Sequence, residues 1–73
     1  MRVKFIFRNP TIELPNKDFA TCSDAVKFWK RMASMNYDVS STLSSIKLGN
    51  NNGVFHSVAI DYGFMVDLAK AGL

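Results

Sequence analysis

The side chains that could carry catalytic chemistry are few and widely spaced in this sequence. Histidine is the side chain best suited to general acid–base catalysis near neutral pH, and the chain has one, His56. It lies between Val54 and Val58 in an alternating stretch, which favours a sheet histidine among apolar neighbours. Ser57 cannot join it in a catalytic group, because adjacent strand residues point to opposite faces. We therefore expect no catalytic residue, and an RNA-cleaving enzyme that uses His56 is the least favoured alternative.

The only cysteine, Cys22, is expected in the first turn of a helix, where the helix dipole can lower the pKa of a thiol and raise its reactivity. No Cys-x-x-Cys motif accompanies it, so a structural role is favoured. One cysteine and one histidine are too few for a structural zinc site, and the six carboxylates are isolated. The sequence therefore predicts no metal site and no cofactor. A single cysteine also excludes an intramolecular disulfide, which makes the cytoplasm the expected compartment.

The candidate binding residues are mostly basic and fall in two stripes. The chain has nine Lys and Arg against six Asp and Glu, a net charge of +3, which favours an anionic partner without requiring one. The first stripe lies on one face of an N-terminal strand: Arg2, Lys4, Ile6 and Arg8. The second lies on the outer face of a helix: Lys27, Lys30 and Arg31. Each could contact phosphates, although a solvated charged face is the simpler interpretation. If the helix covers the apolar side of the strand, the two stripes lie on opposite sides of the sheet.

A run of three asparagines forms the third candidate surface. Asn50, Asn51 and Asn52 precede Gly53, and an Asn-Gly pair is a strong short-range signal of a β-hairpin. We expect this run to form the hairpin tip between Leu48 and Val54. Its amides could contact a partner, since exposed loop tips commonly carry binding residues.

The elements that position these residues begin with a strand. Val3, Phe5 and Phe7 alternate with mostly charged residues, which is the period of a half-buried strand. A shorter alternation follows at residues 11–14, between two prolines. We expect it to pair with the first strand as an edge hairpin.

A helix is predicted over residues 22–35, with Thr21 as its N-cap. Its apolar stripe consists of Ala25, Phe28, Trp29, Met32 and Ala33. Residues 39–46 fit a helix by spacing, but the serines and threonine there are poor helix formers. We favour a strand over residues 42–48, with irregular chain before it.

The C-terminal part of the chain predicts a strand over residues 54–60 and a final helix capped by Asp61. The apolar stripe of that helix consists of Phe64, Met65, Leu68 and Ala69. Gly72 lies where a left-handed residue ends a helix, and Leu73 could fold back as its hydrophobic partner.

The resulting order, β-β-α-β-β-α, predicts an α+β fold in which helices pack on a small antiparallel sheet of three to four strands. We expect residues 1–73 to form a single compact domain. Hydrophobic residues make up 48% of the chain, which is enough to leave a homodimer open. No segment approaches the ~20 apolar residues that span a bilayer, so we expect no membrane partner.

The function that the sequence favours is a small non-enzymatic binding or inhibitor protein that docks onto a larger protein or ribonucleoprotein. The support is the absence of a catalytic constellation together with the surplus of apolar residues. Chains of this kind are frequent among phage and mobile-element accessory proteins that act on host machinery, which is a base-rate expectation. The alternative is an RNA- or DNA-binding domain that uses the basic strand face.

Overall fold

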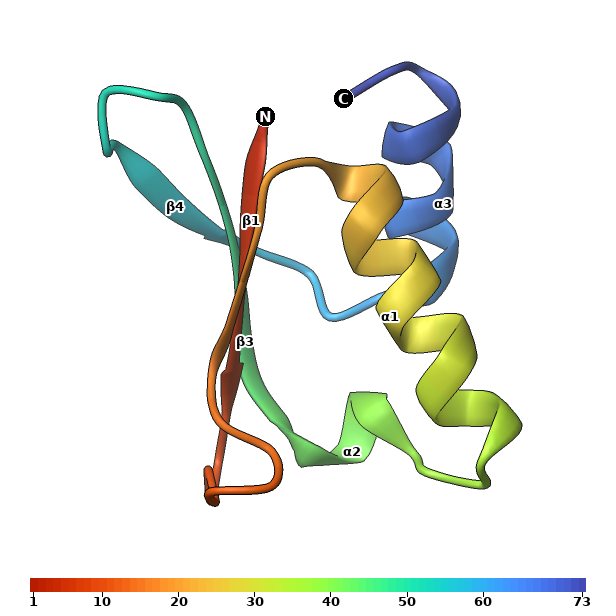
Figure 1. The fold of residues 1–73 in the computed structure, drawn as a ribbon. Helices are drawn as coiled ribbons and strands as arrows, with labels where there is room; N and C mark the ends of the chain where they lie inside the picture. The colour runs from red at the N-terminus through yellow and green to blue at the C-terminus, as the bar shows by residue number, and fades with distance from the viewer.

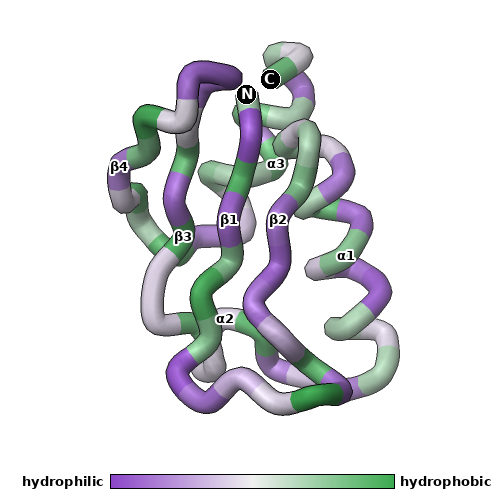
Figure 2. The backbone as a smooth tube through the Cα atoms, turned by 60° about the vertical axis from the view of Figure 1, so that its left-hand side comes forward, coloured by the Kyte–Doolittle hydropathy of each residue, from purple (hydrophilic) through white to green (hydrophobic).

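The computed structural model describes residues 1–73 and has two layers, an antiparallel sheet and three helices on one of its faces (Figure 1). The strands are β1 (Arg2–Phe7), β2 (Lys17–Phe19), β3 (Leu43–Gly49) and β4 (Phe55–Val58). The helices are α1 (Cys22–Ser34), α2 (Val39–Thr42) and α3 (Tyr62–Lys70). The strand order is β2-β1-β3-β4, so the two longest strands are central (Figure 2). The predicted α+β fold is confirmed, with the short helix α2 added.

Strand β1 alternates as its sequence predicts. Val3, Phe5 and Phe7 are buried on the side of the sheet that faces the helices. Figure 2 shows the same alternation as green and purple bands along β1. Because successive strand residues point to opposite faces, the charged residues of β1 are left on the side that no helix covers.

The core lies between the sheet and the helices α1 and α3. Its centre is Phe5, whose ring makes edge-on contacts with Phe19, Phe28 and Trp29 at centroid distances of 5.1, 6.1 and 5.9 Å. Trp29 in turn contacts the ring of Tyr62 at 5.3 Å. Aromatic rings bury large apolar areas, so this cluster joins β1, β2, α1 and α3.

The second strand lies at residues 17–19, so the predicted strand over residues 11–14 was wrong. Residues 11–14 form a turn in which the Thr11 hydroxyl accepts the N–H of Leu14 at 3.0 Å. The Thr11 N–H also donates to the Leu14 carbonyl at 3.0 Å. The alternation was misleading because Ile12 is 96% exposed, and the segment between the two prolines closes on itself instead of pairing.

Pairing with β1 begins after Pro15, beyond the segment that was predicted to pair. The side chain of Asn16 accepts the N–H of Phe7 at 2.9 Å, in the place of a main-chain ladder bond. Lys17 then pairs with Phe5, and Phe19 with Val3. The side-chain oxygen of Asn16 thus supplies the acceptor for the Phe7 N–H and extends the hydrogen bonding of the sheet past the end of β2.

The segment that fits both a helix and a strand is divided between the two. Residues 39–42 form the single turn α2, and β3 begins at Leu43. Irregular chain had been expected before the strand, but the Asp38 carboxylate caps a turn there by accepting from Ser40 Oγ at 2.8 Å and from the Ser41 N–H at 3.4 Å. The hydroxyls that disfavour a long helix therefore stabilise a short one.

The predicted helix ends are confirmed to within one residue. Thr21 Oγ1 accepts the N–H of Asp24 at 3.1 Å at the start of α1, and Asp61 caps α3 through the N–H of Phe64 at 3.3 Å. Gly72 has a φ of +83°, and the N–H of Leu73 donates to the carbonyl of Leu68 at 3.1 Å. This is the left-handed C-terminal cap that the sequence predicts. Strand β4 covers only residues 55–58 of the predicted 54–60.

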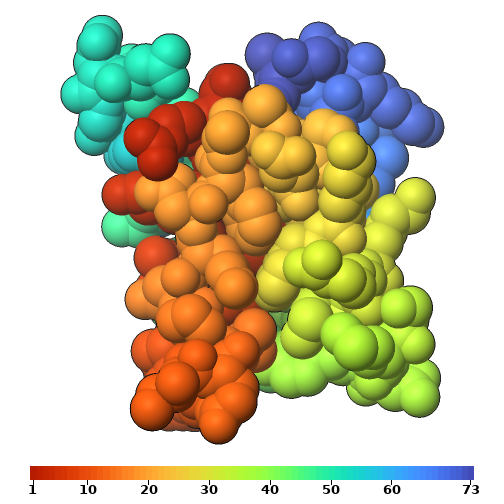
Figure 3. Space-filling view, in the orientation of Figure 1, coloured from red at the N-terminus to blue at the C-terminus, as the bar shows by residue number.

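The two ends of the chain lie at the same end of the molecule (Figure 1). The carbonyl of Leu73 accepts the N–H of Cys22 at 3.0 Å, which satisfies one free donor at the start of α1. Figure 3 shows the β3–β4 hairpin (teal) projecting from the body, with the first residues of β1 (red) at the surface beside it. None of the three helices has the length and apolar content needed to cross a bilayer.

Candidate functional site

The candidate site is the face of the sheet that the helices leave uncovered (Figure 1). We call it the open face. Strand register and side-chain alternation place on it residues from all four strands: Arg2, Lys4, Ile6, Asp18, Ser45, Lys47, Gly49, Phe55 and Ser57. No helix packs on this side, so the half-buried side chains of the open face are covered only by neighbouring side chains of the same face.

Two lysines lie side by side at the centre of the open face. Lys4 on β1 pairs in register with Lys47 on β3, and both are half-buried. Like charges directly opposite each other on neighbouring strands are destabilising. Neither lysine takes part in an ion pair. The centre of this face therefore carries two adjacent positive charges that form no ion pair.

Acidic charge reaches this face only at its β2 edge. Asp18 pairs in register with Lys4, but its carboxylate bonds to the guanidinium of Arg2 at 2.9 Å. Both side chains are close to half exposed, so this pair adds little to stability. Arg8 was expected on the same strand face, yet β1 ends at Phe7 and Arg8 lies in an exposed bend beyond it. The structure therefore places Arg2, Lys4 and Ile6 on one strand face and leaves Arg8 outside the strand.

The open face also carries one aromatic ring. Phe55 pairs in register with Gly49, and a Cβ built on Gly49 would come within 2.4, 2.5 and 2.6 Å of three consecutive atoms of the Phe55 ring. Such similar distances place the glycine under the face of the ring. The ammonium of Lys4 lies over the same ring, 4.3 Å from its centroid, which is cation–π geometry.

The basic stripe of α1 forms a separate surface. Lys27, Lys30 and Arg31 are exposed on the side of the helix that faces away from the sheet. The guanidinium of Arg31 lies 5.8 Å from the centroid of Phe28. As the sequence predicts, α1 covers the apolar face of β1, so this stripe and the open face are on opposite sides and form no single patch.

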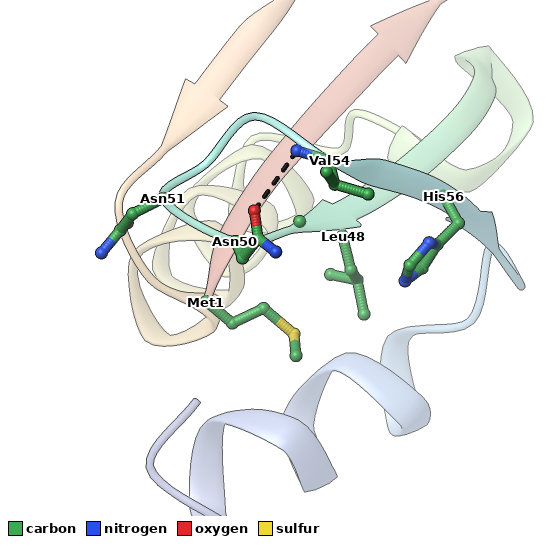
Figure 4. Close-up of a pocket in the computed structure, with 7 residues that line it drawn as sticks. Met1, Leu48, Asn50, Asn51, Val54 and His56 are labelled. Carbon is green, nitrogen blue, oxygen red and sulfur yellow. Dashed lines mark hydrogen bonds between the residues drawn. The ribbon is translucent and has the colours of Figure 1, made fainter.

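The asparagine run forms the predicted hairpin tip. Asn50 Oδ1 accepts the N–H of Asn52 at 2.9 Å. It also accepts the N–H of Val54 at 3.3 Å (Figure 4). Gly53 has a φ of +83°, which glycine adopts without strain. The side chain of Asn50 therefore builds the turn, while those of Asn51 and Asn52 are exposed and make no hydrogen bond within the protein.

A shallow groove of about 360 Å³ lies beside this tip, on the helix side of the sheet. It is lined by Met1, Leu48, Gly49, Asn50, Asn51, Val54 and His56. Figure 4 shows the side chains of Met1, Leu48 and His56 on the side of the strands that faces α3. His56 is exposed on this side of β4, and its strand neighbour Ser57 points to the opposite face.

The thiol of Cys22 is fully buried in the core. Burial raises the pKa of this thiol, and the nearby N-terminal ammonium offsets part of the rise. The pKa of this thiol therefore moves in the direction opposite to the lowering expected at the start of a helix. No three side chains of the His, Cys, Asp or Glu type lie together as a metal site.

Sequence reasoning proposed Arg2, Lys4 and Ile6 and missed the other six residues of the open face, among them Lys47, Gly49 and Phe55. The alternation of Ser45, Lys47 and Gly49 with buried apolar residues in β3 was the available signal, since it marks the polar face of a strand. That signal predicts which face of β3 is polar, but it does not predict which residues of other strands lie beside it. Only the pairing of β1 with β3 shows that Lys47 lies beside Lys4.

Comparison of the chain with protein families, with curated proteins and with solved structures finds no match.

Proposed function

We propose that this protein binds nucleic acid through the open face of its sheet. The observation that carries the proposal is the pairing of Lys4 with Lys47 on the two central strands. Neither lysine forms an ion pair, because the carboxylate of Asp18 beside Lys4 bonds to Arg2. A phosphate backbone that crosses the two ammonium groups would remove their mutual repulsion and release counterions. The apolar side chains of Ile6 and Phe55 would add contact area beside the charges.

The shape of the surface also supports this function. A sheet face without a covering helix is open to an extended polymer, and sheet faces that mix cations with aromatic rings are used to bind nucleic acids.

We place the protein in the cytoplasm, because a chain with one buried cysteine needs no oxidising compartment. We do not extend the proposal to RNA cleavage, since His56 lies on the other face of the sheet from Lys4 and Lys47.

A matched pair of double variants tests the proposal. Lys4→Gln with Lys47→Gln removes two charges from the open face, and Lys27→Gln with Lys30→Gln removes two from the helix stripe. Binding of a fluorescein-labelled oligonucleotide is measured by anisotropy over a range of salt concentrations. We expect the open-face pair to lower the slope of log affinity against log salt by about 1.4 for a single strand, at ~0.7 per phosphate contact. Equal effects of the two pairs, or no binding by the unchanged protein, would contradict the proposal.

Docking onto a larger protein is the second candidate function, supported by the groove beside the hairpin tip. Met1 and Val54 are 48% and 57% exposed and line the same groove, and exposed apolar side chains that lie together mark interaction surfaces. Affinity capture after nuclease treatment separates the two candidates. A single protein that the unchanged chain retains and Val54→Asp loses would favour docking. Loss of all retained material on nuclease treatment would favour nucleic-acid binding.

A further inference from the structure

The ring of Phe55 is isolated from the core. It belongs neither to the buried cluster nor to the partly buried side chains that pack against that cluster, and it contacts no other aromatic ring. The sheet itself separates it from the apolar layer. A large aromatic side chain on a polar sheet face gains little from burial, so its position calls for another explanation.

Gly49 provides a flat seat for this ring. A glycine within a strand weakens the strand, and any other residue at position 49 would place a Cβ as close as 2.4 Å to the ring. With Gly49 under one face, the opposite face of the ring points away from the sheet. Gly49 is buried even though it has no side chain and belongs to the open face, which agrees with a ring lying over it.

The ring of Phe55 has one charged neighbour, and no ion pair holds that neighbour in place. Lys4 Nζ lies 4.3 Å from the ring centroid and forms no ion pair. A cation–π contact at a surface site is weak, and the lysine stem is flexible. A phosphate within reach of Lys4 would compete with the ring for the ammonium.

We propose that Phe55 is a stacking site for one base of a single-stranded nucleic acid, with Gly49 as its seat and Lys4 as the cation that moves from the ring to the adjacent phosphate. The inference rests on the proposed function and specifies its substrate class. An unpaired base presents its π-face to an aromatic side chain, whereas a base within a duplex is already stacked on its neighbours. The protein should therefore prefer a single strand to a duplex of the same sequence.

The test compares two variants of Phe55 with one control variant on α3. Phe55→Tyr keeps the aromatic face, Phe55→Leu keeps an apolar side chain without a π-face, and Phe64→Leu removes an exposed ring on α3 as the matched control. The ligands are a fluorescein-labelled oligonucleotide of roughly twelve nucleotides, as DNA and as RNA, and the same sequence as a duplex. A second oligonucleotide carries 2-aminopurine, whose fluorescence is quenched on stacking.

We expect Phe55→Leu to weaken single-strand binding by roughly ten- to a hundredfold and to reduce the 2-aminopurine quench. Phe55→Tyr and Phe64→Leu should bind within about twofold of the unchanged protein, because neither removes the stacking face. Loss of affinity with the lysine double variant but not with Phe55→Leu would overturn the stacking site and leave the proposed function standing. Equal affinity for duplex and single strand would do the same. No binding by any oligonucleotide would overturn both.

A measurement of folding keeps the result interpretable. Urea unfolding of each variant shows whether the protein is still folded in buffer. The affinities are compared in buffer without urea, for the variants that are folded there. If Phe55→Leu is folded and its affinity is unchanged, Phe55 only covers Gly49 and the inference is wrong.

Discussion

The side chain of Asn16 accepts the N–H of Phe7 at 2.9 Å and so extends the hydrogen bonding of the sheet beyond β2. The chain leaves β1 at Phe7 and returns to it only at Lys17. This bond holds the end of the intervening loop to the sheet, while the N–H of Arg8 at its start donates to the carbonyl of Thr42 at 3.0 Å. A partly buried N–H that loses its acceptor carries the cost of desolvation.

Asn16→Leu should therefore lower the free energy of unfolding by about 1–3 kcal/mol, because it leaves the Phe7 N–H without a partner. Asn16→Asp keeps an acceptor at the same position and should stay close to the unchanged protein. Asn51→Leu, at the exposed hairpin tip, is the matched control. Urea unfolding followed by tryptophan fluorescence measures all three. A similar loss from Asn51→Leu would show that the effect comes from changing an asparagine and not from this bond.

Gly49 and Phe55 should behave as one unit in a double-mutant cycle. Gly49→Ala forces the ring off its seat, since the new Cβ would lie as close as 2.4 Å to it. We expect this variant to lose about 1–3 kcal/mol of stability, the usual range for overpacking. In a Phe55→Ala background the same substitution has no ring to displace and should cost clearly less. Equal costs in the two backgrounds would mean that the close approach has no energetic weight.

Cys22 should be inert in the folded protein. Its side chain has no exposed surface, and burial raises the pKa of its thiol, so the reactive thiolate is disfavoured in the native state. Reaction with a chromogenic thiol reagent at neutral pH should be slow in buffer and fast in urea. A rapid reaction in buffer would show that the start of α1 opens readily.

The carboxylate of Asp38 should titrate below the ordinary value for aspartate. The hydroxyl of Ser40 is the largest cause, and the N–H of Ser41 the next, because both hydrogen-bond the ionised form and lower the pKa below 3.8. A carboxylate whose pKa is lower in the folded than in the unfolded state stabilises the protein at pH values above its unfolded pKa, about 3.8. This stabilisation is lost as the pH falls through the pKa of the folded state.

Carboxyl chemical shifts measured by NMR from pH 6 to pH 2 check the direction of this change. Ser40→Ala removes the main donor and should move the pKa of Asp38 back up toward its ordinary value. The stability that Asp38 gives over Asp38→Ala should shrink as the pH falls below 3.8. A pKa that is unaffected by Ser40→Ala would contradict the assignment of the cause.

The sequence by itself determined the features that depend on neighbouring residues. The alternation of Val3, Phe5 and Phe7 gave the buried face of β1, and Thr21 and Asp61 gave the starts of two helices. These features are encoded over three to four residues, because side-chain direction and cap geometry follow from the local backbone. The exception was residues 11–14, where a side-chain turn outcompeted an alternating pattern.

Only the tertiary structure decided which surfaces those elements form together. The pairing of β1 with β3 brings Lys47 beside Lys4, and the β3–β4 hairpin lays Phe55 over Gly49. The register of two strands distant in sequence depends on the packing of the whole apolar face and on loop closure, neither of which a local pattern encodes. For this reason the basic half of the open face was visible in the sequence, whereas its second lysine and its aromatic ring were not.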